Sequence, residues 1–163
     1  MRLSSMADYA VVMMIAAARH CGGARVTAVQ LAEETGLPAP SVQKLVSRLS
    51  AAGLLKSVRG AGGGFKLARP AAAITLADIV EAVEGPIALA TCMETAREPG
   101  KADCALEAGC SLRPHWPLVN ETLRGALAGV VLTQLAAPPI PPTTHPTSRP
   151  TPHPASPAAG APA

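Results

Sequence analysis

The chain has few aromatic residues and few charges for its length. One Trp, one Tyr and one Phe stand among 163 residues, and 15% of the residues are charged. An interior with so few aromatic rings has to be filled by Ala, Leu and Val, which suits packed helices better than a sheet sandwich. The length allows one compact domain and little more. The composition therefore predicts a mainly α-helical fold.

The chain also lacks the short motifs of common enzymes. It has no C-x2-C pair, nucleophile elbow, phosphate-binding loop or His-rich metal motif. The apolar run 9–18 is too short to span a bilayer, and it ends in Arg19-His20 rather than at a small-residue cleavage site. We therefore expect a cytoplasmic protein that is not an enzyme and does not bind membranes. A thiol redox enzyme is the remote alternative.

Residues 28–51 carry the pattern of a helix-turn-helix. Apolar residues recur at helical spacing in 28–35 and again from about Pro40, and Gly36 permits a tight turn between the two helices. The polar face of the second helix holds small, amide and cationic side chains: Ser41, Gln43, Lys44, Ser47 and Arg48. Such side chains reach base edges and phosphates in a major groove. The pattern predicts DNA binding.

A basic hairpin follows directly. Residues 54–59 and 65–69 are expected to be strands, and the glycine-rich run 60–64 forms the turn, with Arg59 near its tip. Residues 25–27 are predicted to pair with this wing, and Thr27 to cap the next helix. Residues 1–70 hold nine Lys and Arg against three Asp and Glu, whereas residues 71–136 hold four against eight. The phosphate-binding surface is therefore expected within residues 1–70.

The second half predicts two more helices. Thr75 caps a helix that ends near Glu84, and a longer helix runs from about Pro114 to Leu135. The longer helix carries an apolar stripe: Val119, Leu123, Leu127, Val130 and Val131. This stripe either folds back on its own domain or pairs with a second copy. A homodimer is favoured, because DNA half-sites usually require two-fold symmetry.

The chain is thus expected to divide into three segments. Residues 1–70 form a winged helix-turn-helix DNA-binding domain, and residues 71–136 contain a cysteine loop and the dimerisation helix. Residues 137–163 are rich in Pro, Ala, Thr and Ser, cannot bury enough apolar surface to fold, and are predicted to be disordered.

Three cysteines lie close together in the predicted loop 87–113. Cys92, Cys104 and Cys110 have the spacing C-x11-C-x5-C. Three thiolates within nineteen residues can bind one soft metal centre, either an iron–sulfur cluster or Zn²⁺. The alternative is incidental cysteines that form a disulfide on oxidation. A fourth ligand is needed for a four-coordinate centre, and the local candidates are Asp103, Glu107 and His115.

Several motifs occur together in one known family. They are Met1-Arg2-Leu3 with Asp8-Tyr9-Ala10-Val11, Leu49-x3-Gly53-Leu54, the glycine-rich wing, Ile79-x3-Val83-Glu84-Gly85, the three cysteines and Trp116. Over about residues 1–135 the chain resembles the Rrf-type winged-helix transcriptional regulators, which include IscR-like members and NsrR-like nitric-oxide sensors. The segments 84–89 and 104–113 make it most similar to the SUF-system iron–sulfur assembly regulators.

The resemblance implies a homodimer with crossing helices, in which each subunit holds a cluster through Cys92, Cys104 and Cys110. The cluster would be of the two-iron or four-iron type. This chain departs from the family pattern in two ways: the first cysteine gap is x11 rather than x5, and Arg113 stands where IscR-like members have a ligating His. NsrR-like members use an aspartate of the partner's first helix. Asp8 matches it and ranks first as fourth ligand, ahead of Glu107 and His115.

The resemblance also implies how DNA is contacted. The helix from about Pro40 would read the major groove of a palindromic operator through Ser41, Gln43 and Lys44, and Arg59 would reach the minor groove. Phosphates would be held by Arg48, Lys56 and Lys66, which position the protein without specifying sequence.

The sequence therefore predicts a transcriptional regulator, with repression favoured, that senses iron–sulfur or redox status and controls iron–sulfur assembly genes. The alternative is a DNA-binding regulator with a metal-free thiol switch or a zinc site.

Overall fold

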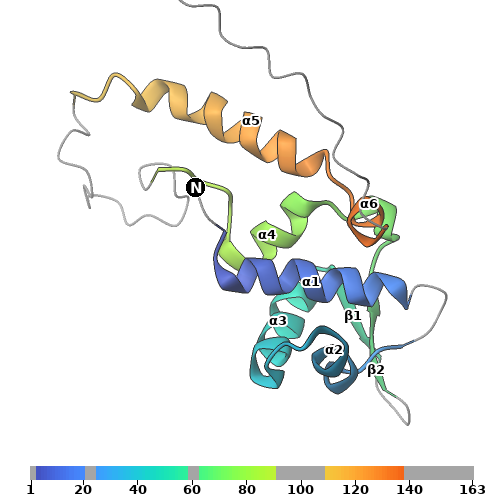
Figure 1. Ribbon diagram of the computed structural model, residues 1–163. Coiled ribbons are helices and arrows are strands. Elements are labelled where there is room, and N and C mark those ends of the chain that lie inside the picture. The colour runs from blue at the N-terminus through green and yellow to red at the C-terminus, as the bar shows by residue number, and fades with distance from the viewer. Residues whose placement is uncertain (1–2, 21–24, 59–62, 91–108, 138–163) are drawn as a thin grey trace, which may run out of the picture.

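The computed structural model describes residues 3–20, 25–58, 63–90 and 109–137. Within these ranges the chain is mainly helical, with one two-stranded antiparallel wing, as the sequence predicts (Figure 1). The elements in chain order are α1 (Ser5–Arg19), α2 (Ala28–Thr35), α3 (Ala39–Ala51), β1 (Leu55–Val58), β2 (Gly64–Leu67), η1 (Ala71–Ala73), α4 (Leu76–Glu84), η4 (Arg113–His115), α5 (Trp116–Ala128) and α6 (Leu132–Ala136). The predicted tail lies outside the described residues, except Ala137.

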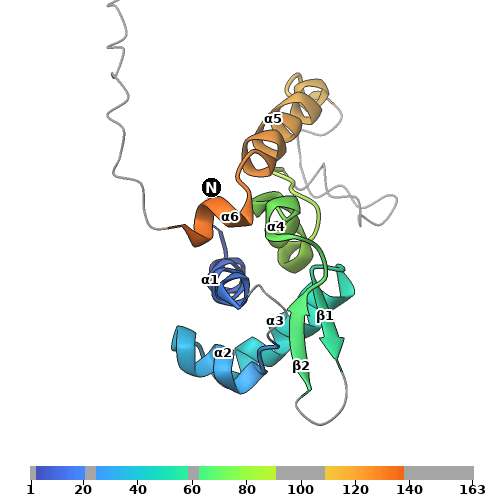
Figure 2. The same cartoon turned by 90° about the vertical axis from the view of Figure 1, so that its right-hand side faces the viewer.

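Helix α1 is the central element of the core. It buries the apolar face expected from its sequence: Ala10, Met13, Met14 and Ala17. It ends at Arg19, two residues before the predicted end at Cys21. The helix lies between the helix-turn-helix on one side and α4 and α6 on the other, and it contacts all of them (Figures 1 and 2).

The wing is anchored to the segment before α2. Strands β1 and β2 pair from Leu55 opposite Leu67 to Val58 opposite Gly64. The predicted third pairing is confirmed, because Val26 forms an antiparallel bridge with Phe65. Its amide donates to the Phe65 carbonyl at 3.0 Å, and the Phe65 amide donates back at 2.8 Å. The wing is therefore held at the base by backbone hydrogen bonds to a buried residue.

Helix α4 begins and ends where the sequence predicts. Thr75 is its N-cap, and Gly85 follows its last residue with a φ of 88°. The helix buries Ile79 and Val83 in the same hydrophobic cluster as α1 and α3. Residues on both sides of position 70 thus share one core.

The predicted single helix over 114–135 is wrong. The helix α5 ends at Ala128, the chain becomes extended at Val131, and a short α6 follows. The break arises because this segment pairs with the residues before α4: the Leu76 amide donates to the Val130 carbonyl, and the Leu132 amide to the Ile74 carbonyl, both at 2.8 Å. This pairing buries Leu132 completely against the core.

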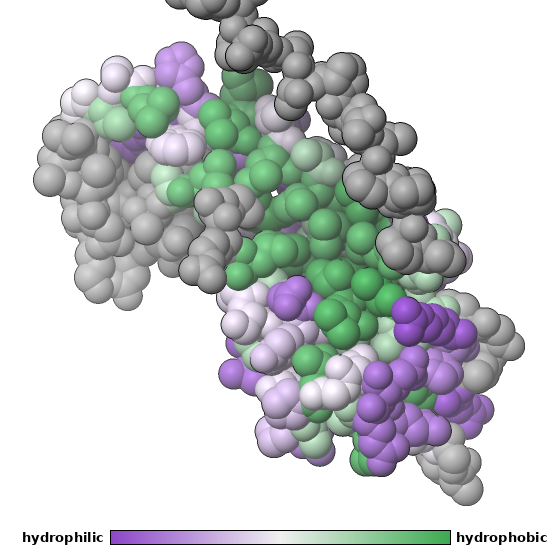
Figure 3. Space-filling view, in the orientation of Figure 1, coloured by the Kyte–Doolittle hydropathy of each residue, from purple (hydrophilic) through white to green (hydrophobic). Residues whose placement is uncertain are grey.

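Helix α5 itself buries no residue. It lies beside α4, away from the helix-turn-helix (Figures 1 and 2). Leu118 is 68% exposed and Val119 is 39% exposed, and Val12 of α1 is 38% exposed. Figure 3 shows apolar residues gathered across the middle of one face of the molecule. Of the two fates considered for the apolar stripe, its carboxyl-terminal end folds back on the domain, while the part on α5 stays accessible.

Candidate nucleic-acid interface and cysteine segment

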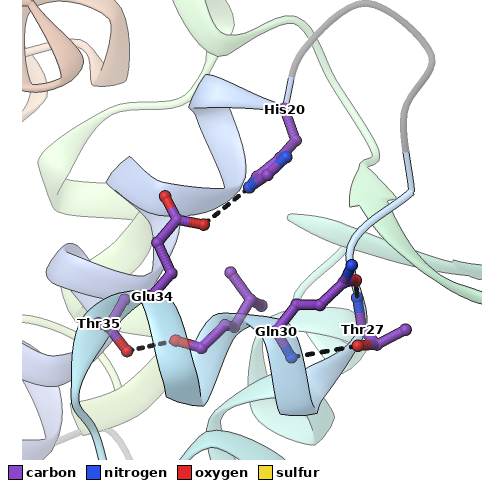
Figure 4. A network of polar contacts seen from close by, with 6 residues as sticks. His20, Thr27, Gln30, Glu34 and Thr35 are labelled. Carbon is purple, nitrogen blue, oxygen red and sulfur yellow. Dashed lines mark hydrogen bonds and ion pairs between the residues drawn. The ribbon is translucent and has the colours of Figure 1, made fainter.

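The two ends of α2 are fixed by side chains of the helix-turn-helix itself (Figure 4). Thr27 and Gln30 form a capping box: the Thr27 Oγ1 accepts from the Gln30 amide at 3.2 Å, and the Gln30 Oε1 accepts from the Thr27 amide at 2.9 Å. Such a box satisfies two amides that the helix leaves free. Near the other end, His20 Nε2 of α1 lies 2.8 Å from Glu34 Oε2. The first helix of the motif is therefore oriented against α1.

The turn between the helices sets the direction of α3. Gly36 has a φ of 70°, a backbone conformation that favours glycine, and its amide donates to the Ala32 carbonyl. Leu37 packs partly buried against the core, as expected from its position between the helices. Helix α3 then buries Val42, Leu45, Val46 and Leu49, and this face fixes its rotation about its own axis.

Burial on one face leaves the predicted base-reading side chains on the other. Gln43 and Lys44 are exposed, and Ser41 is half-buried in the first turn. The Ser47 hydroxyl donates to the Gln43 carbonyl, a contact with the backbone that leaves the Gln43 amide group available. An exposed helix face with amide and ammonium groups has the donors and acceptors that base edges require. The contacts themselves stay predictions.

The wing places two lysines directly opposite each other. Lys56 of β1 is the register partner of Lys66 of β2, and both are exposed. Like charges facing each other across a strand pair destabilise the pair, so their presence indicates an anionic partner such as a phosphate backbone. Arg59 lies outside the described residues, so its predicted place in the minor groove stays untested.

Arg48 has a contact that sequence reasoning missed. Its Nη1 donates to the carbonyl of Val83, in the last turn of α4, at 2.8 Å. The sequence shows only a cation on the polar side of a helix, and the reach of its head group depends on how α4 packs against α3. Phosphate binding by Arg48 stays a prediction, and in this structure its guanidinium holds the end of α4.

The amino-terminal end of α4 is also fixed by charge. Thr75 and Asp78 form a capping box, and Asp78 Oδ2 lies 3.5 Å from Arg69 Nη2. Burial opposes ionisation of the Asp78 carboxyl, but hydrogen bonds from Thr75 and the positive charge of Arg69 outweigh it and lower its pKa. On the next turn, Glu81 pairs with Arg124 of α5 through two hydrogen bonds, of 2.9 and 3.2 Å. This pair raises the pKa of the Arg124 guanidinium.

The structure describes only part of the predicted metal centre. Cys92, Cys104 and Glu107 lie outside the described residues, as do Asp103 and Cys21. Cys110 is a free, half-buried cysteine three residues before η4. Asp8 is exposed in the first turn of α1, and His115 is exposed at the end of η4. Among the described residues, no group of three or more potential ligands comes together.

The donor set fits a cluster in its chemistry. Iron–sulfur clusters are held by thiolates, and Cys110 is neither oxidised in a disulfide nor buried. Asp8 presents a carboxylate to the outside of its own subunit, where a second copy could use it. The ligand set stays a prediction. Within the described ranges, no helix has the length and apolar character needed to cross a membrane.

Comparison with known proteins identifies the class of molecule. Residues 3–138 match the family model Rrf2, described as an iron-dependent transcriptional regulator. The chain is 33% identical over 135 residues to the HTH-type transcriptional regulator IscR of Photobacterium profundum, covering 83% of this chain and 75% of that protein.

Two solved structures share the fold. CymR, the global cysteine regulator of B. subtilis, has a TM-score of 0.63 and 29% identity, with 83% of this chain and 96% of that chain covered. The IscR of T. potens has a TM-score of 0.58 and 28% identity, with 83% and 85% covered. These matches run through both the winged helix and the carboxyl-terminal helices, and the chain belongs to the Rrf2 family of DNA-binding transcriptional regulators, which are not enzymes.

Proposed function

We propose that this regulator is a homodimer that senses iron–sulfur or redox status through a cluster held by Cys92, Cys104 and Cys110, with Asp8 of the partner subunit as fourth ligand. It would act as a repressor in the cytoplasm, on genes for iron–sulfur assembly of the SUF type. The likeness to IscR and the match to an iron-dependent family support this proposal.

One observation carries the proposal. Cys110, free and half-buried, ends the three-cysteine segment just before η4 and α5, while Cys92 follows α4 in the sequence. Ligands at both ends of the segment would therefore join the chain leaving α4 to the chain entering α5. A bound cluster would supply sensitivity to oxidants, nitric oxide and iron supply.

The dimer is supported by the unburied side of α5. A helix of this length gains most of its stability from packing an apolar face, yet α5 leaves Leu118 and Val119 largely uncovered by its own chain. A second copy placed across this face would cover them and would bring two recognition helices to two half-sites of a palindrome.

DNA would be read by α3 and held by the wing. Gln43 and Lys44 offer an amide and an ammonium group to base edges, and Ser41 lies one turn closer to the start of the helix. Lys56, Lys66 and Arg59 would contact the sugar–phosphate backbone and the minor groove beside it.

The proposal is tested by replacing cysteines one at a time under anaerobic conditions. Cys104→Ser should lose bound iron and sulfide, whereas the matched control Cys21→Ser should keep both, because Cys21 lies outside the three-cysteine segment. DNA selected from a random pool by the wild-type protein should then be bound with different affinity by the two variants. Full iron and sulfide in Cys104→Ser would contradict the ligand set.

A second function is favoured by the likeness to CymR, whose name describes a global cysteine regulator. In this alternative the cysteines form a metal-free thiol switch or a zinc site. It predicts colourless protein whose electrophoretic mobility or zinc content, rather than its iron content, changes on treatment with oxidant or Cys104→Ser.

A further inference from the structure

The last turn of α4 is bonded to two other elements. Arg48 of α3 donates to the Val83 carbonyl at 2.8 Å, and the Ser4 hydroxyl, at the N-cap of α1, donates to Glu84 Oε1. These contacts join residues far apart in the sequence. The end of α4 is thus linked both to the helix that reads DNA and to the start of α1, close to Asp8.

The contact of Arg48 suits its place at a helix end. Carbonyls in the last turn have no partner within the helix, and the same end carries the negative end of the helix dipole. Val83 is 8% exposed, so water has little access to this residue. A guanidinium satisfies the carbonyl with a charge-assisted hydrogen bond and compensates the dipole at the same time.

Arg48 differs in this respect from its neighbours on α3. Gln43, Lys44 and Ser47 are exposed, whereas Arg48 is half-buried and its head group is directed to another helix. A side chain that binds phosphate has to present its donors to the duplex. The donor that Arg48 uses here is instead part of the contact between α3 and α4.

We propose that Arg48 is a positioning residue, which fixes the orientation of the recognition helix by bonding it to the end of α4, and that it is not a phosphate contact. The inference rests on the proposed function in one respect: movement at the end of α4 would reach α3 through this bond. Glu84 is eight residues from Cys92, and Glu81 is paired with Arg124 of α5, so α4 adjoins both ends of the cysteine segment along the chain.

The salt dependence of DNA binding separates the two roles. A phosphate contact releases counterions, so its loss lowers the slope of log Kobs against log salt by about 0.9. Arg48→Met should weaken binding to the DNA fragment selected by the wild type by about 5- to 150-fold, the usual range of coupling between sites, without changing the slope. Lys56→Gln is the matched control and should lower the slope. A slope lowered equally in Arg48→Met would overturn the proposal.

A second variant covers the case in which Arg48→Met does not fold. Arg48→Lys keeps the charge, which a phosphate accepts, but replaces the guanidinium with a compact ammonium on a stem without its reach. Positioning predicts weaker binding for Arg48→Lys at an unchanged slope. Wild-type affinity in this variant would show that charge alone is required, and would overturn the proposal.

The link to the cluster has a readout of its own. The ratio of DNA affinities of cluster-loaded and cluster-free protein should move towards one in Arg48→Lys, because the bond that transmits the change is weakened. A ratio unchanged from the wild type would refute transmission through Arg48. A wild-type ratio of one would instead contradict the proposed sensing function, and the salt slopes would still decide the role of Arg48.

Discussion

Gly64 offers the most direct test of how the wing is attached. A Cβ built on Gly64 would lie 2.7 Å from the Val26 carbonyl oxygen and 3.1 Å from its carbon, and both are backbone atoms. Neither can turn away as a flexible side chain would, and Val26 is 2% exposed. Gly64→Ala should therefore separate the wing from residue 26 and break the two hydrogen bonds between Val26 and Phe65.

The expected loss follows from those two bonds. At about 0.5–1.5 kcal/mol each, they contribute about 1–3 kcal/mol to the free energy of unfolding. For a domain of this size the melting temperature should fall by roughly 4–20 °C in a thermal unfolding experiment followed by circular dichroism. Gly109→Ala is the control, because nothing lies within 4 Å of its added Cβ. A Gly64→Ala protein as stable as the control would refute this account of the wing.

Three further predictions concern charge and assembly. Asp78→Asn keeps a capping oxygen but removes the charge facing Arg69; because the folded pKa of Asp78 is lowered, the wild type should be more stable near neutral pH and should lose this advantage as the pH falls below the ordinary carboxyl pKa of 3.8. An equal difference at all pH values in urea titrations would contradict it. Replacing Lys56 and Lys66 together by Gln should lower the salt slope of DNA binding by about 1.8 if each meets one phosphate, with no loss of thermal stability, because two like charges face each other. An unchanged slope would remove the wing lysines from the interface. Val119→Asp should convert the dimer to a monomer in analytical ultracentrifugation without unfolding it, since Val119 is 39% exposed in the single chain. Retention of the dimer would place the interface elsewhere.

Local signals in the sequence predicted most of the winged helix. Thr27 and Thr75 cap the helices that they were expected to cap, because a capping box depends on residues only three positions apart. Gly36 adopts the positive φ expected of the turn. The pairing of Val26 with the wing was predictable for a different reason, since a short β-prone segment lies directly before the helix-turn-helix.

The break between α5 and α6 could not be predicted in the same way. Val130 and Val131 continue the helical spacing of the apolar stripe, so the local pattern favours an unbroken helix. What ends it is hydrogen bonding with residues 74–76, more than fifty positions earlier in the chain. Such long-range pairing leaves no periodic signal.

Arg48 was placed on the correct helix but given a role that its contacts do not support directly. A sequence fixes which side of α3 carries the residue, whereas the destination of a long side chain depends on its tertiary neighbours. The candidate cluster ligands differ again. Their residue types and spacing favour a thiolate centre, and only Cys110, Asp8 and His115 among them lie in the described structure.

The central claim is that this Rrf2-family regulator holds an iron–sulfur cluster. The most direct test is the visible absorption spectrum of protein purified without oxygen, together with iron and acid-labile sulfide assays. The account predicts brown protein with matching amounts of iron and sulfide. Colourless protein that contains neither, and that takes up neither on reconstitution, would contradict it and would leave the thiol or zinc switch as the sensing mechanism.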